Sequence, residues 1–391
     1  MLGFILAAGV VLILAAARQP TPQRSLEPAA SEGKPPPPPD PGSAGPGEVD
    51  VTFEYSSEKA DWIEAAVAEF QKTNPQIHVV LIGKGSLESA AAIVDGTDHP
   101  VVWSPADSLV LNLATADWQA RHAGAPLFAT TGDAAPQPLV LSPLVFVAWD
   151  KHARPLDVGA GPLSWKTLRR AIAPNADGKP ARGGITLGHT DPGKSNSGLA
   201  ALVGMTYEYF GATSGLTAEQ LIDPRYLDFL RDIERGVPHF EASTGTLMTD
   251  MIRFGPSKYD VAVVYESTAV SQLERAQGRW GNLHIYYPPT TIWSDHPVVV
   301  LDAPWVTPVQ KAAGEALTAF LRSTPVQKTA LRFGFRPADD AVAMKTADPA
   351  NPFTKHAKYG LSLELPPAAQ PPDAAVVRNL LMLWSRVTRM R

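Results

Sequence analysis

The stretch GHTDPGKSNSGL, residues 188–199, joins two segments with different hydrophobic patterns. Residues 184–187 before it resemble a short buried strand, and residues 196–210 continue as an apolar helix. A polar turn between a strand and a helix is typical of an α/β protein. The hydroxyl and amide side chains of this turn are then expected at the carboxyl end of a strand, where α/β proteins bind ligands.

The chain before this turn repeats the same alternation three times. Residues 49–55 (VDVTFEY) alternate as a strand does, and the following helix places Trp62, Ile63, Ala66, Val67 and Phe70 at helical spacing. The predicted strands are 49–55, 77–82 and 101–103, and the predicted helices are 58–73, 86–94 and 106–120. This order predicts a parallel sheet with helices on its faces.

A second α/β series follows the long apolar run PLVLSPLVFVAW, residues 138–149. Its predicted helices are 164–173, 196–210, 217–235 with a break at Pro224, 244–254 and 267–280, and its predicted strands are 184–187, 260–265 and 283–287. Another apolar run, residues 297–301, crosses back, and helices 310–323, 325–333 and 374–387 follow. We therefore predict an α/β protein of two lobes, joined by two crossing segments that act as a hinge. Lobe 1 comprises 49–140 and 295–391, lobe 2 comprises 145–290, and the hinge comprises 141–149 and 288–297.

The N-terminal segment indicates export. Residues 2–17 are uncharged and apolar, shorter than the ~20 residues of a typical membrane-spanning helix but suited to a signal peptide. Residues 18–48 form a Pro-rich linker that includes five consecutive prolines, and such a segment is an extended spacer. We expect a periplasmic or extracellular protein, with residues 2–17 either cleaved as a signal peptide or kept as a membrane anchor.

Composition excludes several classes of function. The net charge is −5, which gives no basic footprint for nucleic acid. The 391-residue chain has no cysteine, so disulfides, thiolate metal sites and a lipoprotein anchor are excluded. The nine histidines are scattered, and no metal-binding or catalytic spacing is recognised. We predict no cofactor, no metal and no catalytic residue.

Residues 188–195 also fit the phosphate-loop pattern G-x-x-x-x-G-K-[ST], which makes an NTPase an alternative. Pro192 lies inside this loop and has no N–H to offer a phosphate. A nucleotidase also needs a magnesium-binding aspartate after an apolar strand, whereas the nearest candidate strand ends in Tyr265-Glu266. Residues 56–59 (SSEK) fit the S-x-x-K pattern of serine acyltransferases, but the companion S-D-N and K-T-G elements are missing. Both patterns are less favoured than a ligand site.

Hydroxyl and amide side chains recur where a predicted strand gives way to a helix. The positions are Ser56, Ser57, Gly85, Ser86, Ser104, Thr190, Ser195, Asn196 and Ser197, with Tyr265 and Glu266 before another such start. Each could be only a helix N-cap, since Ser, Thr and Asn are favoured there. Their recurrence in both lobes favours a shared site in which helix N-termini and hydroxyls hold an anion.

Three motifs carry a family resemblance: EYSSEKADW at 54–62, VVWSPAD at 101–107 and TDPGKSNSGL at 190–199. With the two hinge-like runs, they resemble the type II periplasmic (extracellular) solute-binding proteins of ABC transporters, in the branch related to molybdate- and sulfate-binding proteins. The resemblance covers about residues 49–335. It implies a two-lobed fold, a cleft that closes and no catalysis. It further implies ligand contacts from Ser56, Ser57, Ser86, Ser104, Ser195, Asn196, Ser197, Tyr265 and Glu266.

We therefore predict a monomeric receptor that captures a small molecule or inorganic anion, with an oxyanion favoured, and delivers it to an ABC permease. The acidic residues Glu58, Asp191 and Glu266 lie near the predicted site and leave a cation or an amino-bearing ligand open. The N-terminal segment leaves open a second alternative, a ligand-free bilobal interaction module of the cell envelope. The residues after about 335 have no predicted role.

Overall fold

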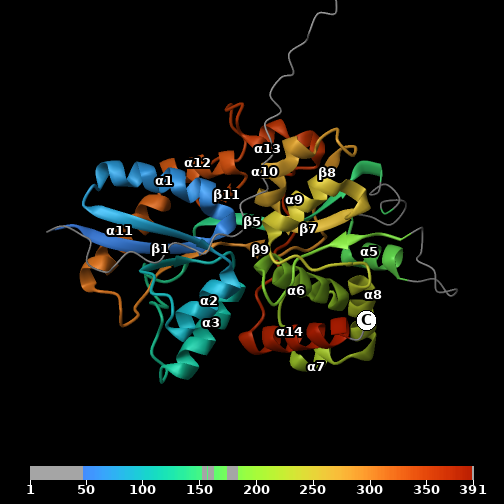
Figure 1. The fold of residues 1–391 in the computed structure, drawn as a ribbon, viewed down its shortest axis with the longest axis horizontal. Helices are drawn as coiled ribbons and strands as arrows, with labels where there is room; N and C mark the ends of the chain where they lie inside the picture. Colours follow the sequence, from blue (N-terminus) through green and yellow to red (C-terminus); the bar gives the residue numbers. More distant parts are fainter. Residues whose placement is uncertain (1–46, 152–155, 157–162, 174–183, 390–391) are drawn as a thin grey trace, which may run out of the picture. The chain divides into compact units, whose positions relative to one another are not determined.

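Two β-sheets with helices around them organise the chain (Figure 1). The structure is a computed structural model, and it describes residues 47–151, 156, 163–173 and 184–389. The described residues fall within one folded unit, Ala44–Arg391. The predicted signal peptide or anchor, residues 2–17, lies outside the described residues, as does nearly all of the linker. Among the described helices, none has the length and apolar character needed to cross a membrane.

The first sheet has the strand order β2-β1-β3-β10-β4. Strands β1 and β2 pair in parallel from Val49↔Ile77 to Ser56↔Lys84, and β1 also pairs in parallel with β3. Strand β10 runs antiparallel to both β3 and β4. The strands are β1 (Val49–Ser56), β2 (Ile77–Lys84), β3 (Val102–Ser104), β4 (Gln137–Pro138) and β10 (Pro297–Val300).

The second sheet is built around the long strand β5 (Val140–Trp149). Strands β7, β8, β9 and β11 all pair with it in antiparallel fashion, and β6 pairs in parallel with β7. These strands are β6 (Leu187–Gly188), β7 (Val261–Tyr265), β8 (Leu283–Tyr286), β9 (Trp293–Ser294) and β11 (Arg336–Pro337). The predicted parallel sheets are thus mixed sheets, because the crossing strands β5 and β10 run against their neighbours.

Helices cover both faces of the first sheet and create its core. Residues at helical spacing on α1, including Trp62 and Phe70, are almost fully buried against β1 and α11. The elements are η1 (Ser57–Lys59), α1 (Ala60–Thr73), α2 (Ser86–Asp95), α3 (Ser108–Arg121), α11 (Pro308–Leu321), α12 (Thr324–Ala330) and η4 (Leu331–Phe333). Hydrophobic burial of this kind contributes about 25 cal/mol per Å² of apolar surface.

The second sheet has its own helices, with α6 buried along most of its length. The elements are α5 (Trp165–Ile172), α6 (Asn196–Phe210), α7 (Ala218–Leu221), α8 (Pro224–Glu234), α9 (Thr244–Phe254), η3 (Gly255–Ser257) and α10 (Glu266–Ala276). The C-terminal helices are α13 (Pro352–Lys355), η5 (Ala357–Tyr359) and α14 (Ala374–Arg389). Helix α14, within the range assigned from sequence to lobe 1, packs on α6, α7 and α8 and also contacts α3. The lobe boundaries remain a prediction.

Three segments of the chain connect the sheets. The first is the start of β5, and the second runs from β9, which pairs with Ser142 and Pro143 of β5, into β10 of the first sheet. The third follows α11 and α12 and leads to β11, which pairs with β5. Between β9 and β10 lie Asp295 and His296, and His296 adopts a positive φ of 40°. This backbone conformation is uncommon for a residue other than glycine, so the surrounding contacts must hold the crossing in place.

Candidate functional site

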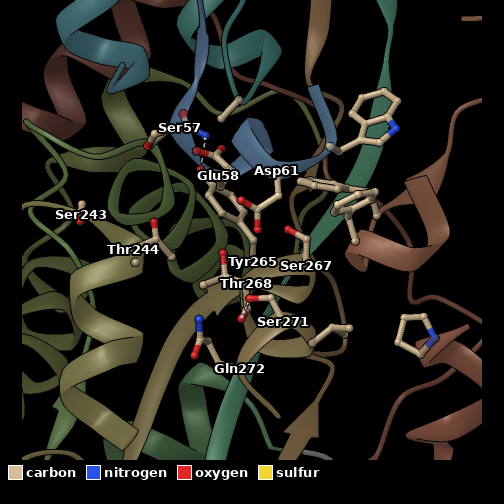
Figure 2. Close-up of a pocket in the computed structure, with 18 of the residues that line it drawn as sticks. Ser57, Glu58, Asp61, Ser243, Thr244, Tyr265, Ser267, Thr268, Ser271 and Gln272 are labelled. Atoms are coloured by element: carbon tan, nitrogen blue, oxygen red, sulfur yellow. Dashed lines mark hydrogen bonds between the residues drawn. The ribbon is translucent and has the colours of Figure 1, made fainter. Parts of the chain in front are cut away.

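A cavity of about 550 Å³ lies between elements of the two sheets. Its lining comes from η1, α1 and α2 on one side and from α6, α9 and α10 on the other. Residues of the C-terminal segment, which we define as residues 331–389, lie at one end. Figure 2 shows Ser57, Glu58 and Asp61 facing Ser243, Thr244 and Tyr265 across it. Hydroxyls and carboxylates therefore dominate the facing walls, and the predicted cleft has a counterpart in the structure.

Helices α2, α6 and α10 begin at this cavity without a side-chain cap. Their N-cap residues are Gly85, Ser195 and Tyr265, and none of them accepts a capping hydrogen bond. By contrast, α3, α5, α8, α9 and α11 are capped by Asp107, Ser164, Asp223, Ser243 and Thr307. Helix N-termini carry unsatisfied N–H groups and partial positive charge. The N-termini of α2 and α6 can therefore offer N–H donors to an anion. At the N-terminus of α10 one donor is already used, because the Ser267 N–H donates to Ser142 Oγ at 3.0 Å.

The structure brings six of the predicted site residues to the cavity wall. They are Ser57, Gly85, Ser86, Ser195, Asn196 and Tyr265. Ser86 Oγ accepts a hydrogen bond from the Ala106 amide at 2.9 Å, so its own proton remains available to a ligand. Asn196 Nδ2 donates to the Tyr265 hydroxyl at 2.8 Å, and both side chains are almost fully buried.

The other predicted residues lie behind the wall and support it. Ser197 is nearly fully buried, with its hydroxyl 2.8 Å from that of Thr190 and 2.6 Å from that of Thr244. Glycine is required at position 198, because a Cβ there would overlap the carbonyl oxygen of Thr190. Thr190 and Ser197 thus fix the start of α6 against its neighbours, while Ser195 and Asn196 face the cavity.

Ser56 and Ser104 belong to a buried cluster around Lys59. Lys59 is fully buried, and its Nζ donates to Ser56 Oγ at 2.6 Å and to the Ser104 carbonyl at 2.9 Å. Nζ also contacts the Pro105 carbonyl at 3.1 Å and His296 Nδ1 at 3.3 Å. Burial lowers the pKa of Lys59 to about 7 and the pKa of His296 well below its usual range. The SSEK pair is therefore close in space, but neither side chain reaches the cavity.

Glu266 also lies behind the wall. Its carboxylate receives two hydrogen bonds from Arg336, Nε to Oε2 and Nη2 to Oε1, both at 2.7 Å, and a third from the Tyr287 hydroxyl. Both members of this ion pair are buried, at 5% and 0% side-chain exposure. Glu266 is thus fully engaged with the C-terminal segment.

The phosphate-loop pattern does not produce a phosphate cradle. Asp191 accepts the loop amides: its Oδ1 takes the Gly193 N–H at 2.8 Å, and its carbonyl takes those of Lys194 and Ser195 at 3.0 and 2.9 Å. The Lys194 side chain is 69% exposed and lies 3.9 Å from Asp191. The donors that a phosphate loop directs at nucleotide are therefore occupied by an aspartate of the same turn.

Asp107, which is buried, and Asp295, which is half-buried, are two carboxyl groups that do not line the cavity. Asp107 caps α3 through Leu109 N at 2.8 Å and accepts from Ser294 Oγ at 2.9 Å. Asp295 accepts from Ser108 N at 2.9 Å and Ser108 Oγ at 2.5 Å. Burial, reinforced by the charge of Asp295, raises the pKa of Asp107 to about 8. The first-sheet helix α3 thereby holds the crossing segment through two carboxyl groups.

Replacing Asp107 with asparagine is expected to change how stability depends on pH. The folded protein keeps the Asp107 proton up to about pH 8, whereas the unfolded chain releases it above about pH 4. The unfolding free energy contributed by Asp107 therefore falls as pH rises from 4 to 8. Asparagine keeps the N-cap without titrating. Urea unfolding measures the difference in unfolding free energy between D107N and the wild type. This difference should move in favour of D107N by about 1 kcal/mol or more when the pH is raised from 5 to 8.

The exposed N-cap of α8 provides a control. Asp223 Oδ1 accepts from Arg225 N at 2.8 Å, as Asp107 does from Leu109 N. D223N should shift the unfolding free energy by less than about 1 kcal/mol at either pH. A D107N protein whose difference from the wild type is the same at both pH values would contradict the prediction.

Several residues that line the cavity were not among the predicted ligand contacts. They are Glu58, Asp61, Ser243, Thr244, Ser267 and Thr268. Ser243 and Thr244 begin helix α9 after a segment without strand character, so the strand-to-helix rule did not select them. Ser267 follows Tyr265-Glu266, and the polar start of that helix was the signal that could have found it. Among the described residues, no group of three His, Cys, Asp or Glu could hold a metal ion.

The comparison with known families decides the identity of the fold. The sequence model of bacterial extracellular solute-binding proteins matches residues 51–336, which is more than half of the chain. The chain belongs to the bacterial extracellular solute-binding proteins. None of the curated proteins matches this solute-binding protein in sequence.

Solved structures agree with this family. The sulfate-binding protein SubI from Mycobacterium tuberculosis H37Rv is similar with a TM-score of 0.55 and 18% identity, covering 88% of this chain and 99% of its own. A periplasmic thiamin binding protein gives a TM-score of 0.58 and 14% identity, covering 87% and 96%. AfuA from Actinobacillus pleuropneumoniae, with exogenous fructose-6-phosphate bound, gives a TM-score of 0.57 and 15% identity, covering 89% of this chain and 100% of its own. At these identities the likeness establishes the two-lobed type II fold, and the family and these neighbours are binding proteins rather than enzymes.

Proposed function

We propose that this solute-binding protein captures a small ligand with an anionic group in the 550 Å³ cavity and delivers it to an ABC permease. The observation that carries the proposal is the absence of side-chain caps on α2 and α6, two described helices that begin at the cavity. Uncapped helix N-termini are a preferred environment for anionic oxygens. Ser57, Ser86 and Ser195 supply hydroxyl donors around them.

The size of the cavity favours an organic ligand over a bare inorganic oxyanion. A volume of 550 Å³ lies within the roughly 300–1,000 Å³ of sites that bind drug-sized molecules. The structural neighbours bind ligands as different as sulfate, thiamin and fructose-6-phosphate, so the fold accommodates this range. An oxyanion is then the charged group of the ligand and is placed at the α2 and α6 N-termini.

Binding is proposed to be coupled to closure of the two lobes. Donors on opposite sides of the cavity, such as Ser86 of α2 and Ser195 before α6, can contact one ligand only when both sides approach it. A ligand that binds the closed form more tightly shifts the population toward it. The protein is proposed to do no chemistry on its ligand, to act as a monomer and to work outside the cytoplasmic membrane, free or tethered by residues 2–17.

Calorimetry on the full chain with a panel of sulfonates, phosphates and carboxylates tests this function. At least one anionic compound should bind, and S86A should weaken its binding by about tenfold or more, because the Ser86 hydroxyl proton is free for the ligand and a hydrogen bond to a charged group contributes about 1.5–3 kcal/mol. Ser214, which is exposed and does not line the cavity, gives the matched control S214A with unchanged affinity.

Two outcomes would favour the alternatives. Magnesium-dependent nucleotide binding that is lost in K194A would support an NTPase. Failure of the whole panel to bind, with the protein instead retained by an envelope partner, would support a ligand-free interaction module and would overturn the proposed function.

A further inference from the structure

The cavity wall at the start of α1 carries two carboxylates, Glu58 and Asp61, one helical turn apart. Figure 2 shows both side chains beside Tyr265, with Asp61 on the side of Ser267. Within the described parts of the chain, neither carboxylate forms an ion pair with a lysine or an arginine. Glu58 Oε1 lies 3.9 Å from His296 Nδ1. Burial holds the pKa of His296 well below its usual range, so this histidine is neutral near pH 7.

The wall also contains buried hydrogen-bond acceptors without donors. The oxygen Oδ1 of Asn196 has no partner among the described residues, although Asn196 is 3% exposed and lines the cavity. Glu58 Oε1 is likewise shielded and unpartnered. A buried polar atom left without a hydrogen bond costs about 1–3 kcal/mol. Lys59 does not relieve this deficit, because its Nζ protons are directed at Ser56, Ser104 and Pro105. The missing donors are expected to come from the ligand.

An ammonium group matches these acceptors better than a metal ion does. Calcium takes about six to eight oxygen ligands, whereas the α1 wall offers two carboxylates and no arrangement of three acidic or histidine residues is found in the described chain. An ammonium group carries one positive charge and three donors. Its three donors match three acceptors of the wall, which are the carboxylates of Glu58 and Asp61 and the amide oxygen Oδ1 of Asn196.

We propose that the ligand is a zwitterion. Its ammonium group is bound by Glu58, Asp61 and Asn196 Oδ1, and its anionic group lies at the N-termini of α2 and α6. The anionic half of this inference rests on the proposed function. The ammonium half rests on separate atoms, the unpaired carboxylates and the orphaned amide oxygen.

Matched pairs of small molecules test the ammonium half. Each pair differs only by an amino group: taurine against ethanesulfonate, phosphoethanolamine against ethyl phosphate, and β-alanine against propionate. Calorimetry on the full chain should show the amino-bearing member of at least one pair binding about tenfold or more tightly than its partner. In E58Q and D61N this preference should fall toward one. The control E64Q changes an exposed glutamate of α1 that does not line the cavity, and it should keep the wild-type preference.

The outcomes separate this inference from the proposed function. If ethanesulfonate, ethyl phosphate, propionate or inorganic sulfate binds as tightly as the amino-bearing compounds, the zwitterion is overturned and the anion receptor stands. If ethylamine binds as tightly as taurine and phosphoethanolamine, the anionic half fails and the proposed function with it. If no compound of the panel binds, both are overturned.

Discussion

Replacing Arg336 with methionine is expected to lower the free energy of unfolding by about 3–5 kcal/mol, the range for breaking a buried ion pair. The change removes two 2.7 Å hydrogen bonds from the buried Glu266 carboxylate. It also removes the donors to the carbonyls of Ser362 and Leu363, through which Arg336 holds the C-terminal segment. Among the side chains that the structure describes, only the Tyr287 hydroxyl would still donate a hydrogen bond to Glu266. Urea unfolding followed by circular dichroism measures the loss.

Two further variants isolate the ion pair. Arg332 lies nearby and forms an exposed pair with Asp348, at 62% and 34% side-chain exposure, so R332M should cost less than about 1 kcal/mol. The double variant E266M/R336M should recover much of the loss, because apolar side chains replace a buried pair without leaving a charge behind. An R336M protein within 1 kcal/mol of the wild type would show that the pair does not hold this segment.

E266Q separates the structural position of Glu266 from the ligand contact that the family resemblance implies. The side chain faces Arg336 rather than the cavity, so we expect E266Q to lower stability and leave ligand affinity unchanged. The sequence placed Glu266 beside Tyr265 at a helix start, and this position is correct. The direction of its side chain depends on Arg336, which lies 70 residues further along the chain. No local pattern carries that information.

The elements themselves were largely predictable because their signals are local. Helix α6, predicted at 196–210, and helix α9, predicted at 244–254, have those limits in the structure. Apolar periodicity and clear flanking turns set them. The antiparallel crossings of β5 and β10 were not predicted, because strand direction within a sheet depends on the path of the whole chain.

The candidate site was predictable in part for the same reason. Gly85 and five polar residues at strand-to-helix turns line the cavity, whereas Ser56, Ser104, Thr190, Ser197 and Glu266 lie behind its wall. The sequence could not distinguish a capping serine from one that leaves the helix end open. Ser243 caps α9 through Thr246 N, but Ser195 makes no such bond at α6. That difference depends on rotamer and packing, not on residue type.

Replacing Lys59 with methionine is the second change with a large expected effect. At pH 9 it should lower the free energy of unfolding by about 2–4 kcal/mol. It leaves the carbonyls of Ser104 and Pro105 without the Nζ donor, and each buried acceptor left unpaired costs about 1–3 kcal/mol. It also releases His296, whose positive φ requires support at the crossing between the sheets. Removing the desolvation cost of a buried amine offsets part of the loss.

The loss should depend on pH in a defined direction. Burial lowers the pKa of Lys59 to about 7, whereas in the unfolded chain the amine holds its proton to about pH 10.4. The unfolded state therefore binds more protons than the folded state between pH 7 and 10, and the unfolding free energy of the wild type gains with rising pH in this window. K59M lacks that gain. The amount by which its unfolding free energy falls below that of the wild type (its deficit) should therefore be larger at pH 9 than at pH 6.

Lys72, on the helix α1 that follows Lys59, supplies the control for this measurement. Its side chain is 66% exposed and pairs with Glu69 at 2.6 Å, so K72M should change the unfolding free energy by less than about 1 kcal/mol at either pH. Urea unfolding of the three proteins at pH 6 and pH 9 gives the comparison. A deficit of K59M that is the same at both pH values would mean that Lys59 keeps its proton in the folded protein. The cluster would then be held by a buried charge, with a charged amine donating to the carbonyls of Ser104 and Pro105 and contacting His296 of the crossing segment.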